Sequence, residues 1–333
     1  MKILVATTVF APRIGGMETA ADLLARGFLA EGHAVTVVTC TPSATPDRDS
    51  LRIVRGPSWV TVLRHVLETD VAVLMGPTLK LGWPLLVSNR RVLVSHQGFL
   101  PLERNPIVGW LRRQLLRRSK HVACSQAVAK SLGIECLIAA NPYQDNLFAT
   151  QARTERSGEL VFLGRLVPEK GLDVLLDAMA LLSAKHITPH LKVVGDGPCR
   201  SDLDDRVRRL GLRDQVEFLG PVVGESLANI LNSHKILVVP STWNEPFGIV
   251  ALEAIACGCM VIGSSAGGLP EAIGPCGITF KNGDCNELAN AIESVLLHPE
   301  TIQSYRNSAP RHLEQHAPLS VARRYIGHLT AAQ

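Results

Sequence analysis

The chain of 333 residues has few aromatic residues and few charges, and it lacks long apolar runs altogether. Charged residues make up 19% of it and hydrophobic residues 46%, which excludes an intrinsically disordered protein. No apolar run approaches the roughly 20 residues that span a bilayer, so no transmembrane helix is predicted. Internal repeats and low-complexity tracts are missing as well, which excludes a solenoid or an array.

Paired cysteines are also missing. The eight cysteines are scattered without C-x-x-C spacing, so a zinc or redox motif is not indicated and we expect reduced structural thiols. The first residues, Met1 to Val5, resemble a buried strand more than a signal peptide, because a turn with Pro12 follows instead of a small-residue cleavage site. We therefore expect a cytoplasmic protein, with peripheral contact at the inner face of the membrane as an alternative.

Strand-like and helix-like segments alternate along the chain, which is typical of parallel sheets with crossover helices. The expected strands are 3–7, 34–40, 51–54, 71–75, 92–95 and 121–124 in the first half, and 160–163, 191–194, 216–219, 236–239, 260–262 and 278–280 in the second. A polar stretch at 151–159 predicts a linker. The fold class is α/β, with two doubly wound, Rossmann-like domains that face each other across a cleft. Their predicted bounds are 1–150 and 151–318, followed by a last helix over 319–333 that is expected to cross back to the first domain.

Two carboxylates, Glu245 and Glu253, lie on either side of an expected helix N-terminus. The segment 236–257 predicts strand, loop and helix, with Pro246 at the first helical position and Glu253 about two turns into the helix. The backbone N–H groups near Phe247, Gly248 and Ile249 would then be free to bind phosphate. The helix dipole adds a positive potential at the same end.

Two further segments suit phosphate groups. Gly15 and Gly16 follow the first strand, where flexible backbone can approach a pyrophosphate, although a plain tight turn is the alternative. Arg165 and Lys170 follow the end of another expected strand, and two cations there fit a diphosphate. The G-x-G-x-x-G fingerprint is absent, and no acidic residue is clearly placed at the end of the second strand, which argues against a nicotinamide cofactor.

The Asp202-Leu-Asp204 sequence superficially resembles a D-x-D metal motif. It lies within a segment dense in alternating Asp and Arg, which is typical of a solvated, ion-paired helix face. We interpret it as helix surface and predict no metal site.

These motifs together, in this order and spacing, resemble the family 4 glycosyltransferases, which have the two-domain GT-B architecture. The resemblance covers nearly the whole chain. Its carriers, besides the two glutamates and Gly15-Gly16, are Ser95-His96-Gln97-Gly98, Cys124-Ser125-Gln126-Ala127, Gly164-Arg165-Leu166, Glu169-Lys170-Gly171 and Val194-Gly195-Asp196-Gly197-Pro198. The resemblance implies a retaining, metal-independent enzyme without a cofactor, whose donor substrate is a nucleoside-diphosphate sugar.

The resemblance also implies roles for individual residues. His96 matches the active-site histidine that contacts the donor sugar, and Arg165 and Lys170 match the pair that stabilises the leaving diphosphate. Glu245 matches the glutamate near the donor hexose, and Glu253 the one near the ribose hydroxyls. The nucleotide region would be lined by Gly195, Asp196 and Gly197, and the phosphates would meet the backbone of Phe247, Gly248 and Ile249. The residues after His96 depart from its usual companions, which leaves the acceptor contacts open.

A basic segment, 110–121, combines arginines with Trp110 and leucines and predicts an amphipathic helix. Its arginines either lie over apolar packing at the surface or dock on an anionic membrane that presents a lipid-linked acceptor.

The expected activity is sugar transfer from a UDP- or GDP-sugar to an acceptor hydroxyl of a glycan, glycolipid or small molecule, in cell-surface polysaccharide or glycolipid synthesis. No nucleic-acid partner is expected. The alternative is a protein of the same fold that binds, epimerises or hydrolyses a nucleotide sugar. The base, the sugar, the acceptor, the linkage and the oligomeric state stay open.

Overall fold

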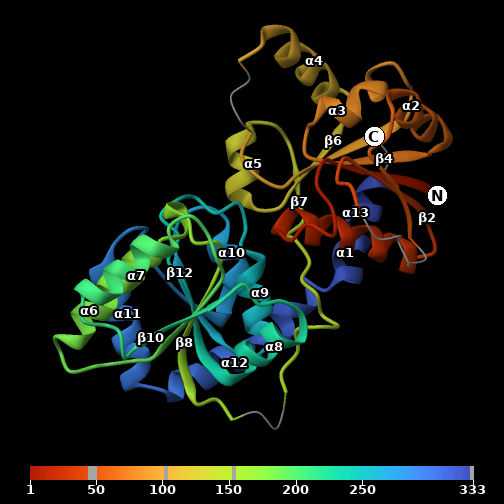
Figure 1. Cartoon of the computed structure of the whole chain (residues 1–333). Coiled ribbons are helices and arrows are strands. Elements are labelled where there is room, and N and C mark those ends of the chain that lie inside the picture. The colour runs from red at the N-terminus through yellow and green to blue at the C-terminus, as the bar shows by residue number, and fades with distance from the viewer. Residues whose placement is uncertain (44–50, 101–103, 152–154, 331–333) are drawn as a thin grey trace. The chain divides into compact units, whose positions relative to one another are not determined.

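The computed structural model describes residues 1–43, 51–100, 104–151 and 155–330 (Figure 1). It divides into two compact units. The first comprises Met1–Gln144 together with the C-terminal segment His316–Gln333, and the second comprises Asp145–Gln315. Each unit has its own parallel sheet, so the predicted α/β class with two doubly wound sheets is confirmed.

The first unit contains a seven-stranded parallel sheet in the order β3-β2-β1-β4-β5-β6-β7. The described strands are β1 (Lys2–Thr7), β2 (Ala34–Thr39), β3 (Arg52–Arg55), β4 (Val71–Met75), β5 (Arg91–His96), β6 (Lys120–Ala123) and β7 (Leu137–Ile138). The six strands predicted here are confirmed with small shifts at their ends. Strand β7 was not predicted, because two residues are too few to give an apolar pattern.

Helices cover both faces of this sheet. Their bounds are α1 (Gly16–Ala30), α2 (Trp59–Glu68), α3 (Leu79–Gly82), η1 (Trp83–Leu86), α4 (Pro106–Arg117), α5 (Gln126–Leu132) and α13 (Pro318–Thr330). Leu4, Leu74 and Val94 point to one face, where they pack with residues of α2, α3, η1 and α4. The C-terminal α13 packs along α1, with the rings of Phe28 and Tyr325 edge to face.

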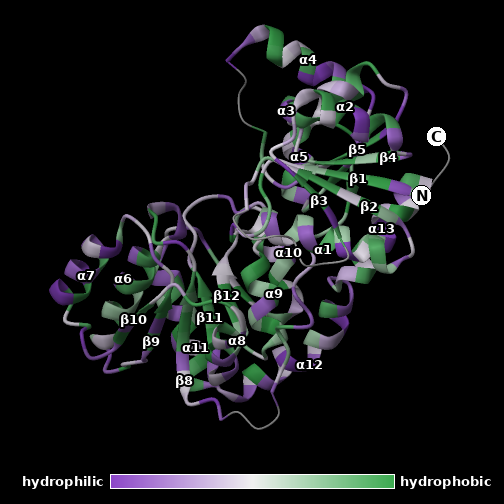
Figure 2. Ribbon diagram, turned by 45° about the vertical axis from the view of Figure 1, so that its right-hand side comes forward, coloured by the Kyte–Doolittle hydropathy of each residue, from purple (hydrophilic) through white to green (hydrophobic). Residues whose placement is uncertain are grey.

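The second unit contains a six-stranded parallel sheet in the order β10-β9-β8-β11-β12-β13. The strands are β8 (Gly158–Leu163), β9 (Leu191–Val194), β10 (Val216–Gly220), β11 (His234–Val239), β12 (Met260–Ser264) and β13 (Gly277–Phe280). The helices are η2 (Pro168–Lys170), α6 (Leu172–Ser183), α7 (Arg200–Arg209), α8 (Gly224–Ser233), α9 (Ile249–Ala256), α10 (Leu269–Ile273), η3 (Gly274–Cys276), α11 (Cys285–Leu297) and α12 (Glu300–Glu314). Figure 2 shows the apolar strands inside and the hydrophilic helix faces outside.

The division between the units differs from the predicted boundary at 150/151. The first unit's N-terminal part ends at Gln144, and the residues that follow make their contacts within the second unit. The Thr150 hydroxyl donates to the Ala256 carbonyl (2.9 Å), and the Gln151 backbone N–H donates to the Asn232 side chain (2.8 Å). Of the predicted linker, residues 152–154 lie outside the described part of the chain, as do 331–333 of the predicted last helix. That helix begins at 318 rather than 319.

The basic segment is also corrected. Helix α4 begins at Pro106, where the Asn105 side chain accepts from two backbone N–H groups, and it ends at Arg117 instead of continuing to 121. Lys120 and His121 belong to β6, which pairs with β5, and this pairing extends the backbone there. Among the described residues, no helix combines the length and apolar character that crossing a bilayer would require.

Candidate functional site

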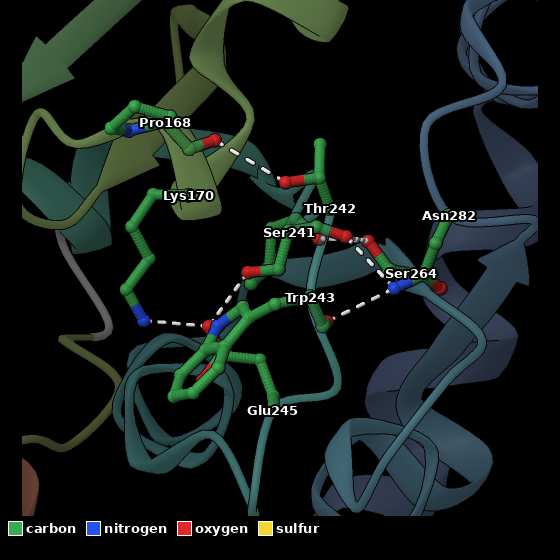
Figure 3. A network of polar contacts seen from close by, with 9 residues as sticks. Pro168, Lys170, Ser241, Thr242, Trp243, Glu245, Ser264 and Asn282 are labelled. Atoms are coloured by element: carbon green, nitrogen blue, oxygen red, sulfur yellow. Dashed lines mark hydrogen bonds and ion pairs between the residues drawn. The ribbon is translucent and has the colours of Figure 1, made fainter.

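An ion pair with a buried carboxylate lies at the carboxyl end of the second unit's sheet, where Glu245 of the loop between β11 and α9 meets Lys170 at the end of η2. The Glu245 side chain is 7% exposed, and its Oε1 lies 2.6 Å from the Nζ of Lys170. The Ser241 hydroxyl donates to the same oxygen at 2.6 Å. Figure 3 shows Lys170 and Ser241 meeting at this carboxylate. A buried charge with both a cation and a hydrogen-bond donor has a fixed position, which a binding site requires.

Side chains from β12 and from the end of β13 hold this loop in place. The Asn282 amide donates to the carbonyls of Ser241 and Trp243, both at 3.0 Å, and accepts from the Ala266 backbone N–H at 2.9 Å. The Ser264 hydroxyl donates to the Ser241 carbonyl at 2.6 Å. These contacts hold the backbone of Ser241 and Trp243, which precede Glu245 in the same loop, and thereby fix the position of Glu245 (Figure 3).

The short helix η2, which ends in Lys170, packs on the same loop. The Thr242 backbone N–H donates to the Glu169 carbonyl (3.0 Å), and its hydroxyl donates to the Pro168 carbonyl (3.3 Å). Gly171 has a φ of 65°, and a Cβ there would overlap the Pro240 carbonyl. Only glycine fits this close approach, so the position of Lys170 relative to Glu245 is fixed by backbone contacts.

A second close approach joins the loops after β8 and β9. Gly195 has a φ of 134°, and a Cβ at Gly195 would overlap the Gly164 carbonyl, as one at Gly197 would overlap that of Leu166. The exposed Asp196 accepts from the Gly197 backbone N–H at 2.8 Å. The close backbone contacts therefore give a structural reason for glycine at positions 195 and 197. Their predicted contact with a nucleotide stays a prediction.

Two further side chains extend from loops at the same end of this sheet. Arg165 is exposed on the loop after β8. Trp243 is 41% exposed, and the Lys170 Nζ lies 5.8 Å from the centre of its ring. The cation and the indole together offer an electrostatic and a stacking surface at one point.

The start of the following helix differs from the prediction. Pro246 is not its first residue, because α9 begins at Ile249 after Gly248, whose φ is 112°. The preceding loop is extended instead: Glu245 forms a β-bridge with the 267–268 segment, and its carbonyl accepts from the Gly268 backbone N–H at 2.6 Å. This pairing holds the residues around Pro246 outside the helix. The side chains of Phe247 and Ile249 are buried, and the predicted binding of phosphate by their backbone stays a prediction.

Glu253 lies one turn into α9 rather than two, since the helix begins later than predicted. Its side chain is only partly exposed, and burial raises the pKa of its carboxyl to about 7. Within the described residues its carboxylate makes no hydrogen bond or ion pair. Burial without a partner raises a pKa and leaves the group open to a ligand donor, as the predicted ribose contact would need.

His96 is the last residue of β5 in the first unit and is 1% exposed. Its Nε2 lies 3.1 Å from the Nδ1 of His121, while its Nδ1 is buried without a hydrogen-bond partner among the described residues. Burial and the neighbouring His121 lower the pKa of His96 to about 4, so the ring is neutral at pH 7. A neutral ring suits hydrogen bonding to a sugar hydroxyl, and that predicted role stays a prediction.

The glycine pair of the first unit begins α1. Gly15 precedes the helix in an extended conformation, and Gly16 is its first residue. A Cβ at Gly15 would meet only the end of the flexible Glu18 side chain. The glycine pair therefore lies at the start of the first helix, and its predicted contact with phosphate stays a prediction.

The D-x-D sequence lies on the exposed side of α7, as predicted. The Asp204 carboxylate lies 3.4 Å from the guanidinium groups of both Arg200 and Arg208. In the described ranges, no three His, Cys, Asp or Glu side chains are arranged to hold a metal ion. The interpretation as an ion-paired helix face is confirmed.

Several residues of the Lys170–Glu245 network were not singled out from the sequence: Ser241, Trp243, Ser264 and Asn282. Asn282 precedes a glycine directly after the last strand, and Ser241 and Trp243 lie in a turn-rich segment between strand and helix. Loops at the carboxyl ends of parallel strands carry ligands in this class of fold, so this position was a usable signal.

Comparison with known proteins gives a match at the level of family. The family model described as "Glycosyl transferases group 1" matches residues 144–312. An uncharacterized glycosyltransferase of Methanocaldococcus jannaschii is 44% identical over 114 residues, which are 34% of this chain and 29% of that protein. A D-inositol 3-phosphate glycosyltransferase of Rhodococcus erythropolis is 37% identical over 168 residues, which are 47% of this chain and 38% of that protein. The chain thus matches well under half the length of these relatives.

Solved structures match over the whole chain. HepE of Anabaena in complex with UDP-glucose has a TM-score of 0.80 at 20% identity and is covered fully, as is this chain. Sucrose-phosphate synthase of Thermosynechococcus elongatus has a TM-score of 0.79 at 22% identity, and the match covers 99% of this chain and 98% of that chain. At these identities the likeness shows the fold alone.

Proposed function

Since the chain belongs to the glycosyl transferases group 1 family, we propose that it is a metal-independent, retaining hexosyltransferase of family 4 that uses a nucleoside-diphosphate sugar. The observation that carries this proposal is the ion pair between the partly exposed Lys170 and the buried Glu245 at the carboxyl edge of the second unit's sheet. The donor is a UDP- or GDP-sugar, and the acceptor is a hydroxyl in a cell-surface polysaccharide or glycolipid. UDP-glucose is bound by HepE, a protein of the same fold.

In the proposed reaction, the acceptor oxygen forms a bond to the anomeric carbon of the donor sugar. The bond from that carbon to the β-phosphate oxygen breaks, its electron pair leaves with the diphosphate, and the hydroxyl proton of the acceptor passes to the leaving phosphate oxygen. Negative charge therefore grows on the diphosphate in the transition state. Lys170 and Arg165 supply positive charge there, and charge that forms only in the transition state is where fixed cations accelerate a reaction most.

Glu245 has two tasks in this proposal. Its Oε1 holds Lys170 and Ser241, and its Oε2 makes no hydrogen bond within the described part of the chain. Oε2 is thus available to accept from a hydroxyl of the donor hexose. Glu253, one turn into α9, accepts from the ribose hydroxyls.

The first test is calorimetric titration of the protein, without added metal, with UDP, GDP, ADP and NADH. One diphosphate binds selectively, and Arg165→Ala weakens it by about tenfold or more, because a charge-assisted phosphate contact is lost. Arg209→Ala, which removes an exposed arginine from α7 of the same unit, leaves binding unchanged. Binding of NADH alone would overturn the proposal. Product analysis with and without an acceptor then separates transfer from epimerisation or hydrolysis of the donor.

A membrane surface is the proposed site of the acceptor. Helix α4 exposes Ile107 (69%) and Trp110 (53%) next to the exposed Arg113 and Arg117, and the segment 106–117 contains no acidic residue. Helix α4 packs on η1, which is followed by Val87, 76% exposed. Apolar side chains between cations are complementary to an anionic bilayer, where the rings and aliphatic groups enter the interface.

Vesicle sedimentation tests this contact. The protein binds phosphatidylglycerol vesicles at low salt, and Arg113→Glu with Arg117→Glu lowers the bound fraction at least about tenfold, since each cation near such a surface contributes about 1 kcal/mol. The matched control, Arg209→Glu with Arg213→Glu, makes the same change of net charge at exposed positions of the second unit. Equal loss in both variants, or equal binding to neutral vesicles, would contradict docking through α4.

A further inference from the structure

His121 forms the middle of a short hydrogen-bonded chain in the first unit. Its Nε2 lies 3.0 Å from the Leu116 carbonyl oxygen, and its Nδ1 lies 3.1 Å from the Nε2 of His96. The two rings are 5.3 Å apart between centres and inclined by 38°. A carbonyl oxygen carries no proton, so the contact with Leu116 requires that His121 carries a proton on Nε2.

Both rings are neutral at pH 7, because burial lowers the pKa of each of them. A neutral imidazole carries one proton only. Since the proton of His121 is on Nε2, its Nδ1 is an acceptor, and His96 must donate to it from its own Nε2. The Nδ1 of His96 is therefore without a proton.

The bare Nδ1 of His96 is buried and has no partner within the described residues. The adjacent Gln97 shows the same condition: its Nε2 donates to the Ser95 hydroxyl at 2.7 Å, and its Oε1 is buried without a partner. Unmade hydrogen bonds of buried atoms cost free energy, and here two neighbouring residues each leave an acceptor open. Both atoms call for a ligand that donates, which is what a hydroxyl group does.

We propose that His121 is a positioning residue that fixes the ring proton of His96 on Nε2, so that Nδ1 accepts a hydrogen bond from a sugar hydroxyl of the substrate. The identity of the ligand as a sugar rests on the proposed function. The placement of the proton rests on the contacts with Leu116 and His121 and on the neutrality of the two buried rings, and it does not depend on the proposed function. Binding of a hydroxyl at His96 would then need no change of tautomer, which makes the site ready before the substrate arrives.

The proton placement is tested on the free protein by long-range proton–nitrogen NMR of ¹⁵N-histidine-labelled samples, with His96→Gln to assign the signals. Wild type shows His96 with a protonated Nε2 and an unprotonated Nδ1. His121→Phe removes the acceptor, and His96 then populates the other tautomer. His121→Asn keeps an acceptor oxygen near the place of Nδ1 and retains the wild-type tautomer. His190→Phe, an exposed histidine of the second unit, serves as control and leaves the His96 signals unchanged.

Transfer activity gives the second readout. His121→Phe lowers kcat/KM at least about tenfold, as expected when one substrate hydrogen bond is lost, while His121→Asn recovers most of it. A protonated Nδ1 in wild-type His96, or an unchanged tautomer in His121→Phe, would overturn the inference. The NMR result stands apart from the proposed function: the expected tautomers without any glycosyl transfer would refute the activity and leave the role of His121 intact.

Discussion

The two units differ in how their candidate sites are built. In the second unit, the site loops are fixed by backbone contacts at Gly171, Gly195 and Gly197, and the matched family segment, 144–312, nearly coincides with that unit. In the first unit, which lies almost entirely outside that segment, the candidate site depends on side chains such as His96 and His121. A close backbone contact that only glycine fits permits few other residues at that position, whereas the residues of a site built from side chains can vary. We infer that this difference makes the second unit the more recognisable of the two.

The surface of the first unit has a further feature. The first unit exposes Trp59 (67%), Val87 (76%) and Ile107 (69%) on α2, after η1 and on α4. These exposed apolar side chains are the kind that mark interaction sites. We infer that the second unit handles the shared donor chemistry, and that the first unit carries what is particular to this protein.

The sharpest test of this comparison is a pair of glycine substitutions. Gly195→Ala places a Cβ against the Gly164 carbonyl at a φ of 134°, so we expect a loss of about 3 kcal/mol or more in the free energy of unfolding. Gly15→Ala, at an extended position facing only the Glu18 side chain, changes it by less than about 0.5 kcal/mol. Urea unfolding measures both. Equal losses would refute the distinction between backbone-built and side-chain-built sites.

The next largest effect is expected at the ion pair. Lys170→Ala removes the cation from Glu245 and from the proposed diphosphate site, and we expect kcat to fall roughly 100- to 1000-fold, as when one transition-state charge contact is lost. Lys185→Ala breaks another lysine–glutamate pair of the same unit, at Glu293, and serves as the matched control. Steady-state kinetics with the diphosphate sugar identified by calorimetry decides it. A similar kcat in both variants would remove Lys170 from the mechanism.

A smaller effect concerns the pH dependence of the second unit. The pKa of Glu253 is raised from 4.5 to about 7, so the folded state holds a proton that the unfolded state releases. The stabilisation is fully present below pH 4.5 and is lost as the pH rises to about 7, and it amounts to about 3 kcal/mol. Glu253→Gln abolishes this part of the dependence, measured by urea unfolding at pH 5 and pH 7.5. The control Glu225→Gln, at an exposed position of α8, keeps the wild-type pH dependence of the free energy of unfolding. A wild-type-like dependence in Glu253→Gln would contradict the assignment.

Much of the fold followed from the sequence, because strand-length apolar runs separated by helical periodicity leave little choice in a parallel α/β protein. The start of α9 did not follow. Pro246 suits a helical N-terminus locally, but the pairing of Glu245 with Gly267 and Gly268 keeps the chain extended there. That pairing joins residues distant in sequence, and no local pattern encodes it.

The candidate site was predicted in part, for the same reason. Lys170 and Glu245 were singled out, and the structure brings them to 2.6 Å of each other. Asn282, which holds their loop, and His121, which contacts His96, were not, because each acts through a contact with a residue distant in sequence. Residues that touch a ligand leave a motif along the chain, whereas residues that position them are found only in three dimensions.

The smallest expected effect tests how the C-terminal helix belongs to the first unit. The Tyr325 hydroxyl of α13 lies 2.7 Å from the Ser95 hydroxyl at the end of β5, and both side chains are fully buried. Tyr325→Phe removes this hydrogen bond while keeping the ring against Phe28, so we expect a loss of about 1 kcal/mol in the free energy of unfolding. Tyr305→Phe is the matched change in the second unit, where the hydroxyl makes no hydrogen bond within the described residues, and it costs nothing measurable. Because Ser95 also accepts from Gln97, next to His96, Tyr325→Phe leaves one of its two contacts in place. If the free energy of unfolding falls while kcat stays unchanged, α13 contributes to the stability of the first unit alone. If kcat falls as well, this helix also fixes the end of β5 for the reaction.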